Sequence, residues 1–191
     1  MGSQPDPNAE LDENGLVVHK HLATVLVVLA AGYDEQTLRY ARSALFNVSV
    51  HTISVAPSDE GLIQGALQDE FQVDQPLEAA RMDDYVGLLV CGGPGSKQLA
   101  DDPKVVELVR AAVQQKKLVA AWGEATSVLA AAGVVKKRKV TGDPSVKSAL
   151  VAAGAKYTGA QVVVDGNFVT GLDDASGFRF GKALVQVVAI P

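Results

Sequence analysis

The sequence predicts an α/β fold in which a mostly parallel sheet is covered by helices on both faces. Along the chain, short apolar runs with strand character alternate with amphipathic stretches of helical period. Several of these runs are apolar throughout, as strands buried on both faces are. Because strands that alternate with helices need crossover connections, their sheet is mostly parallel. At 191 residues the chain is long enough to form one such domain with a substantial core.

The first half of the chain is expected to begin with a strand–helix–strand unit. The predicted elements are the strand Thr24–Leu29, the helix Glu35–Phe46, the strand Val48–Val55, a short extended segment Glu70–Leu77 and a buried strand Val86–Cys91. The last of these strands runs into Gly92 and Gly93, so a turn must follow it.

A helix is predicted after this turn. Asp102 is a candidate N-cap and Pro103 a candidate first helical residue, and apolar residues recur at helical spacing from Val105 to Val113. This spacing predicts that one face of the helix packs on the sheet.

The most informative segment is a sharp strand-to-helix junction. Leu118–Trp122 is predicted as an apolar strand, and the chain passes through Gly123 directly into a helical pattern from Glu124 to Ala132. Gly133 is the residue type expected to end that helix.

The last third of the chain continues the same alternation. The predicted elements are a short helix opened by Asp143 and Pro144, strands Gln161–Asp165 and Phe168–Thr170 around an Asp165-Gly166-Asn167 turn, and a final helix Ser176–Val188. Residues 1–18 are polar and aperiodic, so they are interpreted as a flexible acidic tail, and residues 19–191 as a single domain.

Charge and composition exclude several functional classes. The formal net charge is −5 and the only dense basic run is 136–139, interpreted as a solvated corner rather than an interaction patch, so nucleic acid is not an expected partner. The longest apolar stretch, Leu22–Ala31, is too short to cross a membrane, and the acidic N-terminus does not resemble a secretory signal, so the expected location is cytoplasmic. His19 and His21 lack further ligands at recognisable spacing, and neither a metal nor a cofactor is predicted.

Several short motifs occur in an order that resembles a known family. They are Gly92-Gly93-Pro94-Gly95, Asp101-Asp102-Pro103, Val119-Ala120-Ala121 followed by 129–133, Thr141-Gly142 with Pro144-Ser145-Val146, Ala152-Ala153-Gly154-Ala155, and 162–170. Together they resemble the ThiJ/PfpI family of the class I glutamine amidotransferase-like superfamily, over residues 22 to 189. The resemblance implies a flavodoxin-like fold and a homodimer or higher homo-oligomer. Family members include proteases, deglycases, glyoxalases and chaperones.

This sequence departs from the family where the family places its catalytic residues. The resemblance implies a reactive Cys followed by His in the strand-to-helix turn, where a helix dipole lowers the thiol pKa and backbone N–H groups face a developing oxyanion. The ungapped match puts Gly123 and Glu124 at these two positions. The family's Glu on the first helix corresponds to Thr37, with Asp34 and Glu35 out of phase.

Two further features belong to the same comparison. The His of the family's Thr-Gly-His-Pro-Ser segment is replaced by Asp143. The junction Trp122-Gly123-Glu124-Ala125 is also similar to the C-terminal domain of large-subunit catalases, which lacks the nucleophile as well.

The candidate site residues follow from this match. The predicted ligand pocket consists of Tyr33, Thr37, Gly92, Gly93, Gly123, Glu124, Ala125 and Asp143. Glu124 is either a general acid or base or a helix cap that fills the vacated thiol site. Cys91, the only thiol, is either a relocated nucleophile or a buried hydrophobe. The glycines of the 92–95 turn either bind an anion through backbone N–H groups or simply form the turn.

The sequence therefore predicts a protein of the ThiJ/PfpI type without the Cys, His and Glu site. We expect a non-catalytic binding, chaperone-like or scaffold homodimer whose inherited pocket takes a small-molecule ligand. The alternatives are a lyase, hydratase or isomerase that uses Glu124, or residual glyoxalase or deglycase activity through Cys91.

Overall fold

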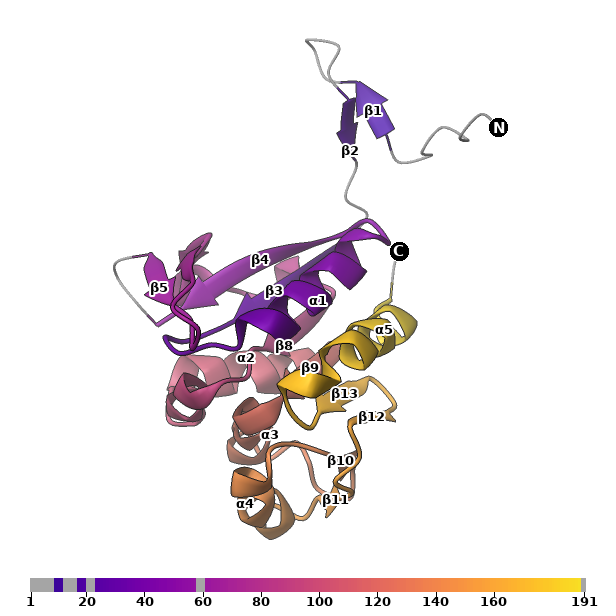
Figure 1. Cartoon of the computed structure of the whole chain (residues 1–191). Coiled ribbons are helices and arrows are strands. Elements are labelled where there is room, and N and C mark those ends of the chain that lie inside the picture. Colours follow the sequence, from indigo (N-terminus) through magenta and orange to yellow (C-terminus); the bar gives the residue numbers. More distant parts are fainter. Residues whose placement is uncertain (1–8, 12–16, 20–22, 58–60, 190–191) are drawn as a thin grey trace.

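The centre of the molecule is a twisted parallel sheet. The structure is a computed structural model, and it describes residues 9–11, 17–19, 23–57 and 61–189. The strands of the sheet are β3 (Ala23–Val28), β4 (Val50–Ala56), β7 (Gln75–Pro76), β8 (Gly87–Val90), β9 (Leu118–Trp122), β12 (Val162–Asp165) and β13 (Phe168–Gly171). Within the described residues they pair in the order β12-β13-β9-β8-β3-β4-β7. Only β12 and β13 pair antiparallel, so the predicted mostly parallel α/β fold is confirmed (Figure 1).

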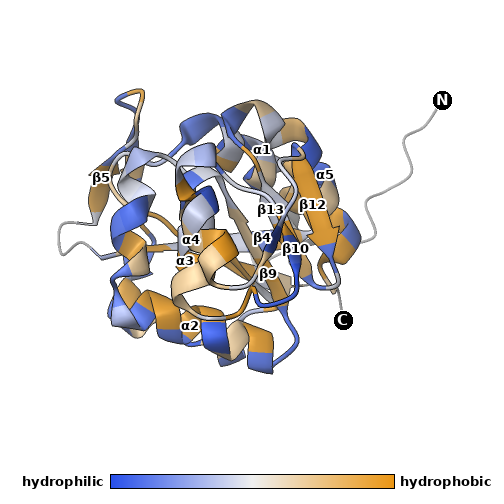
Figure 2. Ribbon diagram, turned by 90° about the horizontal axis from the view of Figure 1, so that it is seen from below, coloured by the Kyte–Doolittle hydropathy of each residue, from blue (hydrophilic) through white to orange (hydrophobic). Residues whose placement is uncertain are grey.

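Helices cover both faces of this sheet. The helices α1 (Glu35–Phe46) and α5 (Gly177–Val187) lie side by side on one face, whereas α2 (Pro103–Gln114), α3 (Thr126–Ala131) and α4 (Lys147–Ala152) pack on the other side (Figure 1). Each face has its own apolar core, centred on Trp122 and Phe180 beneath α1 and α5, and on Leu88 and Phe168 on the other side. Blue and orange segments alternate along α2, as in an amphipathic helix (Figure 2).

Short elements complete the chain between these helices and strands. They are the strands β1 (Ala9–Leu11), β2 (Val17–His19), β5 (Leu62–Gln64), β6 (Glu70–Gln72), β10 (Lys139–Val140) and β11 (Lys156–Tyr157), and the 3-10 turns η1 (Leu77–Ala79), η2 (Met82–Asp84), η3 (Pro94–Ala100), η4 (Gly123–Ala125), η5 (Pro144–Val146) and η6 (Asp174–Ser176). The pairs β1–β2, β5–β6 and β10–β11 form separate small sheets.

The predicted elements agree with the structure where the periodicity is long. The bounds of α1 and β9 are those predicted, and Asp102 caps α2 as expected. The predicted helix Glu124–Ala132 is wrong at its start, because the chain first makes the 3-10 turn η4 and becomes α-helical only at Thr126.

Other differences concern segments in which no strand was predicted. The predicted tail 1–18 contains β1 and the first two residues of β2, which pair antiparallel; its remaining residues lie outside the described residues, as does His21. The hairpin partner β5 and the pair β10–β11 were not predicted. In the described part of the chain, no helix is long and apolar enough to cross a membrane.

The sheet has a topological switch point between the neighbouring strands β3 and β8. From β3 the chain crosses to β4 on one side and later returns to β8 on the other side of β3. The loops that leave β3 and β8 therefore diverge, and in sheets of this kind ligands bind outside the carboxyl ends of the strands at such a switch point. The strand β9 runs parallel to its neighbour β8, so the junction after β9 also lies at the carboxyl ends of the strands.

The cap of α2 allows a direct test of the described fold. The Asp102 carboxylate accepts hydrogen bonds from the N–H groups of Lys104 at 2.8 Å and Val105 at 3.2 Å. Asp102→Ala should lower the free energy of unfolding by about 1 kcal/mol. The neighbouring Asp101→Ala, which removes no such cap, should change it by less than about 0.5 kcal/mol. Urea denaturation measures both, and equal effects would contradict the described cap.

Candidate functional site

The junction after β9 is a tight turn that leaves room for a side chain. Gly123 has a φ of +58°, in the left-handed region that glycine adopts without strain. Its carbonyl oxygen accepts hydrogen bonds from the N–H of Asp143 at 3.2 Å and from Oγ1 of Thr126 at 2.9 Å. A Cβ added at Gly123 would meet nothing within 4 Å. The turn is thus fixed by hydrogen bonds to the carbonyl of Gly123, and the space that a side chain of residue 123 would occupy is open.

A pocket of about 270 Å³ adjoins this open side. Its lining comes from the first turn of α1, from the loop after β5, from the loop after β8, from the junction itself and from the loops before η5 and η6. The lining residues are Asp34, Glu35, Gln36, Ala66, Leu67, Gly93, Pro94, Trp122, Gly123, Glu124, Asp143, Asp173 and Asp174. We call this hollow the junction pocket.

The junction pocket is acidic. Six of its lining residues carry a carboxylate, and none is Lys, Arg or His. Three of the six, Asp34, Asp143 and Asp173, are N-caps, of α1, η5 and η6 respectively, and each accepts a hydrogen bond from a backbone N–H within the next three residues. The positive end of a helix or turn therefore partly offsets the charge of these three side chains.

Asp34 connects the loops that form the pocket. Its Oδ1 accepts hydrogen bonds from the N–H groups of Gln36 and Thr37 at 3.0 and 3.2 Å. Its Oδ2 accepts one from Nε1 of Trp122 at 2.8 Å, and its own N–H donates to the carbonyl of Gly92 at 2.8 Å. One residue thus ties the loop after β3 to the loop after β8 and to the end of β9.

Glu35 and Glu124 differ from the capping residues. Glu35 is buried, and its Oε1 accepts a hydrogen bond of 2.6 Å from the N–H of Leu67 while its side chain packs against Gly65. Glu124 is half-buried, and within the described residues its carboxylate has no hydrogen-bond or ion-pair partner. The sixth carboxylate, Asp174, accepts a hydrogen bond of 2.8 Å from the N–H of Ala175, so Glu124 is the pocket carboxylate left uncommitted within the described residues.

The structure brings half of the predicted pocket residues together. Gly93, Gly123, Glu124 and Asp143 line the junction pocket. Position 93 requires glycine, because a Cβ atom there would lie only 2.4 Å from the carbonyl oxygen of Gly32. These glycines thus allow two loops to pack closely, and the acidic lining of the pocket does not favour an anion.

The other four predicted residues do not line this pocket. Gly92 packs beneath Trp122, and Ala125 points into the core on the α3 side. Thr37 is buried, and its Oγ1 donates to the carbonyl of Asp174 at 3.3 Å. Tyr33 lines a separate groove beyond Glu35, where burial, with help from the Glu35 and Asp69 carboxylates, raises its pKa to about 12.

The loss of the family's acidic partner at Thr37 stays a prediction, but the pocket contains two acidic residues that the match did not assign to it. Asp34 and Glu35 were judged out of phase with Thr37, but both line the pocket. The reason is that Asp34, as N-cap, has an extended backbone with φ −83° and ψ 106°, so helical phase does not apply to it. An Asp directly before a helical pattern is a signal that could have located it, as it could have located Asp173.

The position of Cys91 does not suit a nucleophile, because its side chain is buried away from the junction pocket. It follows β8, has no exposed surface and belongs to the apolar core beneath α1. Its Sγ lies 3.9 Å from the carbonyl oxygen of Asp34, and it does not line the junction pocket. Burial, reinforced by the nearby Asp34 charge, raises the pKa of the thiol well above its ordinary value.

The described residues also contain no group of His, Cys, Asp and Glu side chains suited to a metal ion.

Known proteins resemble this chain over most of its length. A model of the DJ-1/PfpI family matches residues 23–187. An uncharacterized protein of Methanocaldococcus jannaschii is 31% identical over 169 residues, which cover 87% of this chain and 82% of that protein. A deglycase of Pyrococcus abyssi is 30% identical over 146 residues, covering 76% of this chain and 87% of the deglycase. The crystal structure of Drosophila melanogaster DJ-1beta is 25% identical and matches with a TM-score of 0.79, over 87% of this chain and 90% of that one.

The burial of Cys91 predicts an unreactive thiol. At pH 8 the native protein should react with Ellman's reagent about 100-fold more slowly than the protein in denaturant, because labelling requires a local opening of the core and a raised pKa leaves little thiolate. Absorbance at 412 nm follows the reaction. Native labelling as fast as that of the unfolded chain would show that the thiol is accessible.

Proposed function

Because this chain belongs to the DJ-1/PfpI family, we propose that it is a non-catalytic member that binds a small molecule in the junction pocket. The proposal rests on Gly123. The turn that would present a nucleophile has its left-handed backbone, its hydrogen bonds and open space in front, but it has no side chain. Covalent catalysis requires an activated nucleophile at the reacting atom, and this position supplies none.

The charge of the pocket limits what it can bind. Six carboxylates in a lining that contains no Lys, Arg or His create a negative potential that repels anions and favours a protonated amine or another cation. The uncommitted carboxylate of Glu124 is the group best placed to accept the hydrogen bonds of such a ligand. A small primary amine is therefore the proposed ligand class.

A second candidate function is acid–base catalysis by Glu124. It is favoured by the absence of any protein partner for this carboxylate among the described residues and by the relatives that are named deglycases. A carboxylate in a pocket can transfer a proton to or from a bound substrate without a covalent intermediate. Deglycase activity through Cys91 is less well supported, because this thiol is buried away from the pocket. The homodimer and the cytoplasmic location stay predictions.

One set of measurements on the purified full chain separates these functions. Tyramine should raise the melting temperature saturably, whereas 4-hydroxyphenylacetate, the matched acid, should not. Glu124→Gln should weaken tyramine binding about tenfold, since a charge-assisted hydrogen bond contributes roughly 1.5 kcal/mol or more. Glu107→Gln on α2, which removes an exposed carboxylate paired with Lys104 at 3.6 Å, should leave binding unchanged. Methylglyoxal should be consumed no faster than in buffer.

Different outcomes would support the competing functions. Methylglyoxal turnover that Glu124→Gln abolishes at an unchanged melting temperature would overturn the non-catalytic proposal in favour of acid–base catalysis. Turnover that only Cys91→Ser abolishes would identify a relocated thiol nucleophile. Binding of the acid in preference to tyramine would contradict the proposed ligand class.

A further inference from the structure

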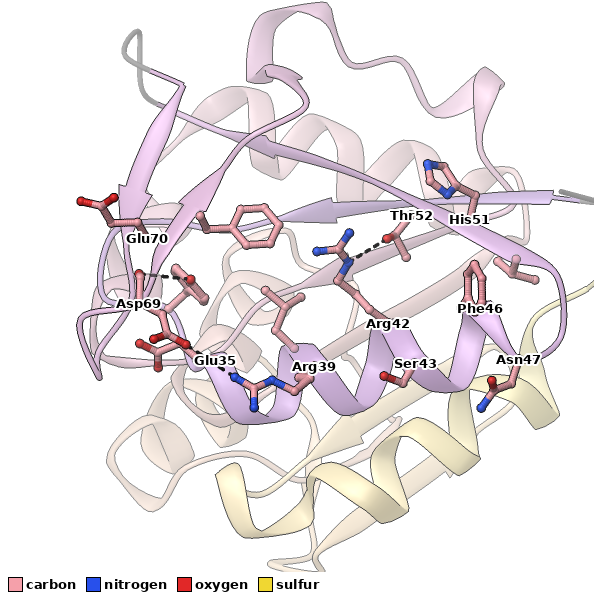
Figure 3. Close-up of a pocket in the computed structure, with 14 residues that line it drawn as sticks. Glu35, Arg39, Arg42, Ser43, Phe46, Asn47, His51, Thr52, Asp69 and Glu70 are labelled. Atoms are coloured by element: carbon pink, nitrogen blue, oxygen red, sulfur yellow. Dashed lines mark hydrogen bonds and ion pairs between the residues drawn. The ribbon is translucent and has the colours of Figure 1, made fainter. Parts of the chain in front are cut away.

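A second and larger hollow lies on the outer side of α1. It has a volume of about 710 Å³ and runs between α1, the first half of β4 and the strand β6 (Figure 3). Glu35 lines both this hollow and the junction pocket, so the two adjoin at the first turn of α1. No sequence motif pointed to this hollow, which we call the α1 groove.

The middle of the α1 groove holds a guanidinium group that has no ion-pair partner among the described residues. Arg42 is half-buried, its Nε donates a hydrogen bond of 3.1 Å to Oγ1 of Thr52, and its Cζ lies 5.2 Å from the ring centroid of Phe71. These two contacts fix the plane of the guanidinium, as Figure 3 shows for the bond to Thr52. Within the described residues, its terminal nitrogens have no hydrogen-bond or ion-pair partner.

Arg39, the other arginine of the α1 groove, differs from Arg42 because it has an ion-pair partner. Arg39 lies one turn earlier on α1, and its Nη2 is 3.5 Å from Oδ2 of Asp69, with both side chains largely exposed. Arg39 is thus already paired at the rim of the groove. A held guanidinium with free terminal nitrogens, such as that of Arg42, matches the two oxygens of a carboxylate.

The surroundings of Arg42 define the rest of a ligand. Leu38 and Val50 are buried and form an apolar floor, and the ring of Phe46, 58% exposed, lies along one wall. The hydroxyl of Thr52, which accepts from Arg42, retains a hydrogen that it can donate. The anionic residues of the groove, Glu35, Asp69 and Glu70, lie at the end away from His51 and Phe46 (Figure 3).

We propose that the α1 groove binds an amphipathic monocarboxylate, with its carboxylate on Arg42 and Thr52 and its aryl or alkyl body along Phe46 and Val50. The three acidic residues at the other end oppose phosphates and other multiply charged anions, because each further negative charge would meet them. The groove is a different site from the junction pocket, and its ligand has the opposite charge, so either proposal can fail without the other.

The test uses 4-phenylbutyrate as the probe and isothermal titration calorimetry of the full chain as the readout. Saturable binding is expected, and the matched alcohol, 4-phenylbutan-1-ol, should bind about tenfold more weakly because it lacks the charge. Arg42→Gln should lower the affinity for 4-phenylbutyrate about tenfold or more. Arg42→Lys, which keeps the charge but loses the planar fork, should give a smaller loss.

Matched variants and conditions decide how a loss is interpreted. Arg39→Gln, one helical turn away, should bind 4-phenylbutyrate as the native protein does, and Arg42→Gln should still bind tyramine and melt at nearly the native temperature. The proposal would be overturned by an absence of saturable binding, by equal losses in Arg39→Gln and Arg42→Gln, or by binding that disappears as protein concentration rises. The last result would mean that a second copy of the chain covers the groove.

Discussion

The hydrogen bonds of Asp34 hold the junction pocket together, and the other features of the site depend on them. The loops that follow β3, β8 and β9 leave the sheet separately, and the strand ladders fix only where each loop begins. Asp34 caps α1 with one carboxylate oxygen, receives the indole N–H of Trp122 on the other, and donates its own N–H to Gly92. This half-buried carboxylate accepts three hydrogen bonds, and the loss of any of these donors would untie one of the loops from the others.

The capping of helix and turn starts also explains why the pocket is acidic. Loops that end at helix starts place N-caps there, and Asp34, Asp143 and Asp173 each satisfy backbone N–H groups. Their negative charge is a by-product of capping, and the helix starts that they cap offset part of it. Glu124 has no such structural task, and Gly123 beside it leaves open space where a side chain would stand. Of the six carboxylates, Glu124 is thus the one that has no hydrogen-bond or ion-pair partner among the described residues.

The accuracy of the sequence predictions followed the length of the periodic pattern. The helix α1 and the strand β9 were predicted with their observed bounds, because twelve amphipathic residues show the helical period and the five apolar residues are too few for a helix and end at a glycine. The two-residue pair β10–β11 has no period to detect. In the site, the junction residues were found through a local match, but Asp34 was missed because a helical phase was applied to an extended N-cap. The α1 groove was missed because Arg42 and Phe71 meet only through tertiary packing.

The alkylation rate of a thiol introduced by Gly123→Cys tests the central claim most directly. The left-handed backbone should cost the variant roughly 1–2 kcal/mol of stability, and Gly123→Ala shares this cost without the thiol. Intact-mass analysis after iodoacetamide treatment at pH 7 should show one adduct in folded Gly123→Cys and none in the native protein, and tyramine should slow the labelling. A folded Gly123→Cys variant that gains no adduct, or whose labelling tyramine leaves unchanged, would contradict an open junction facing a ligand pocket.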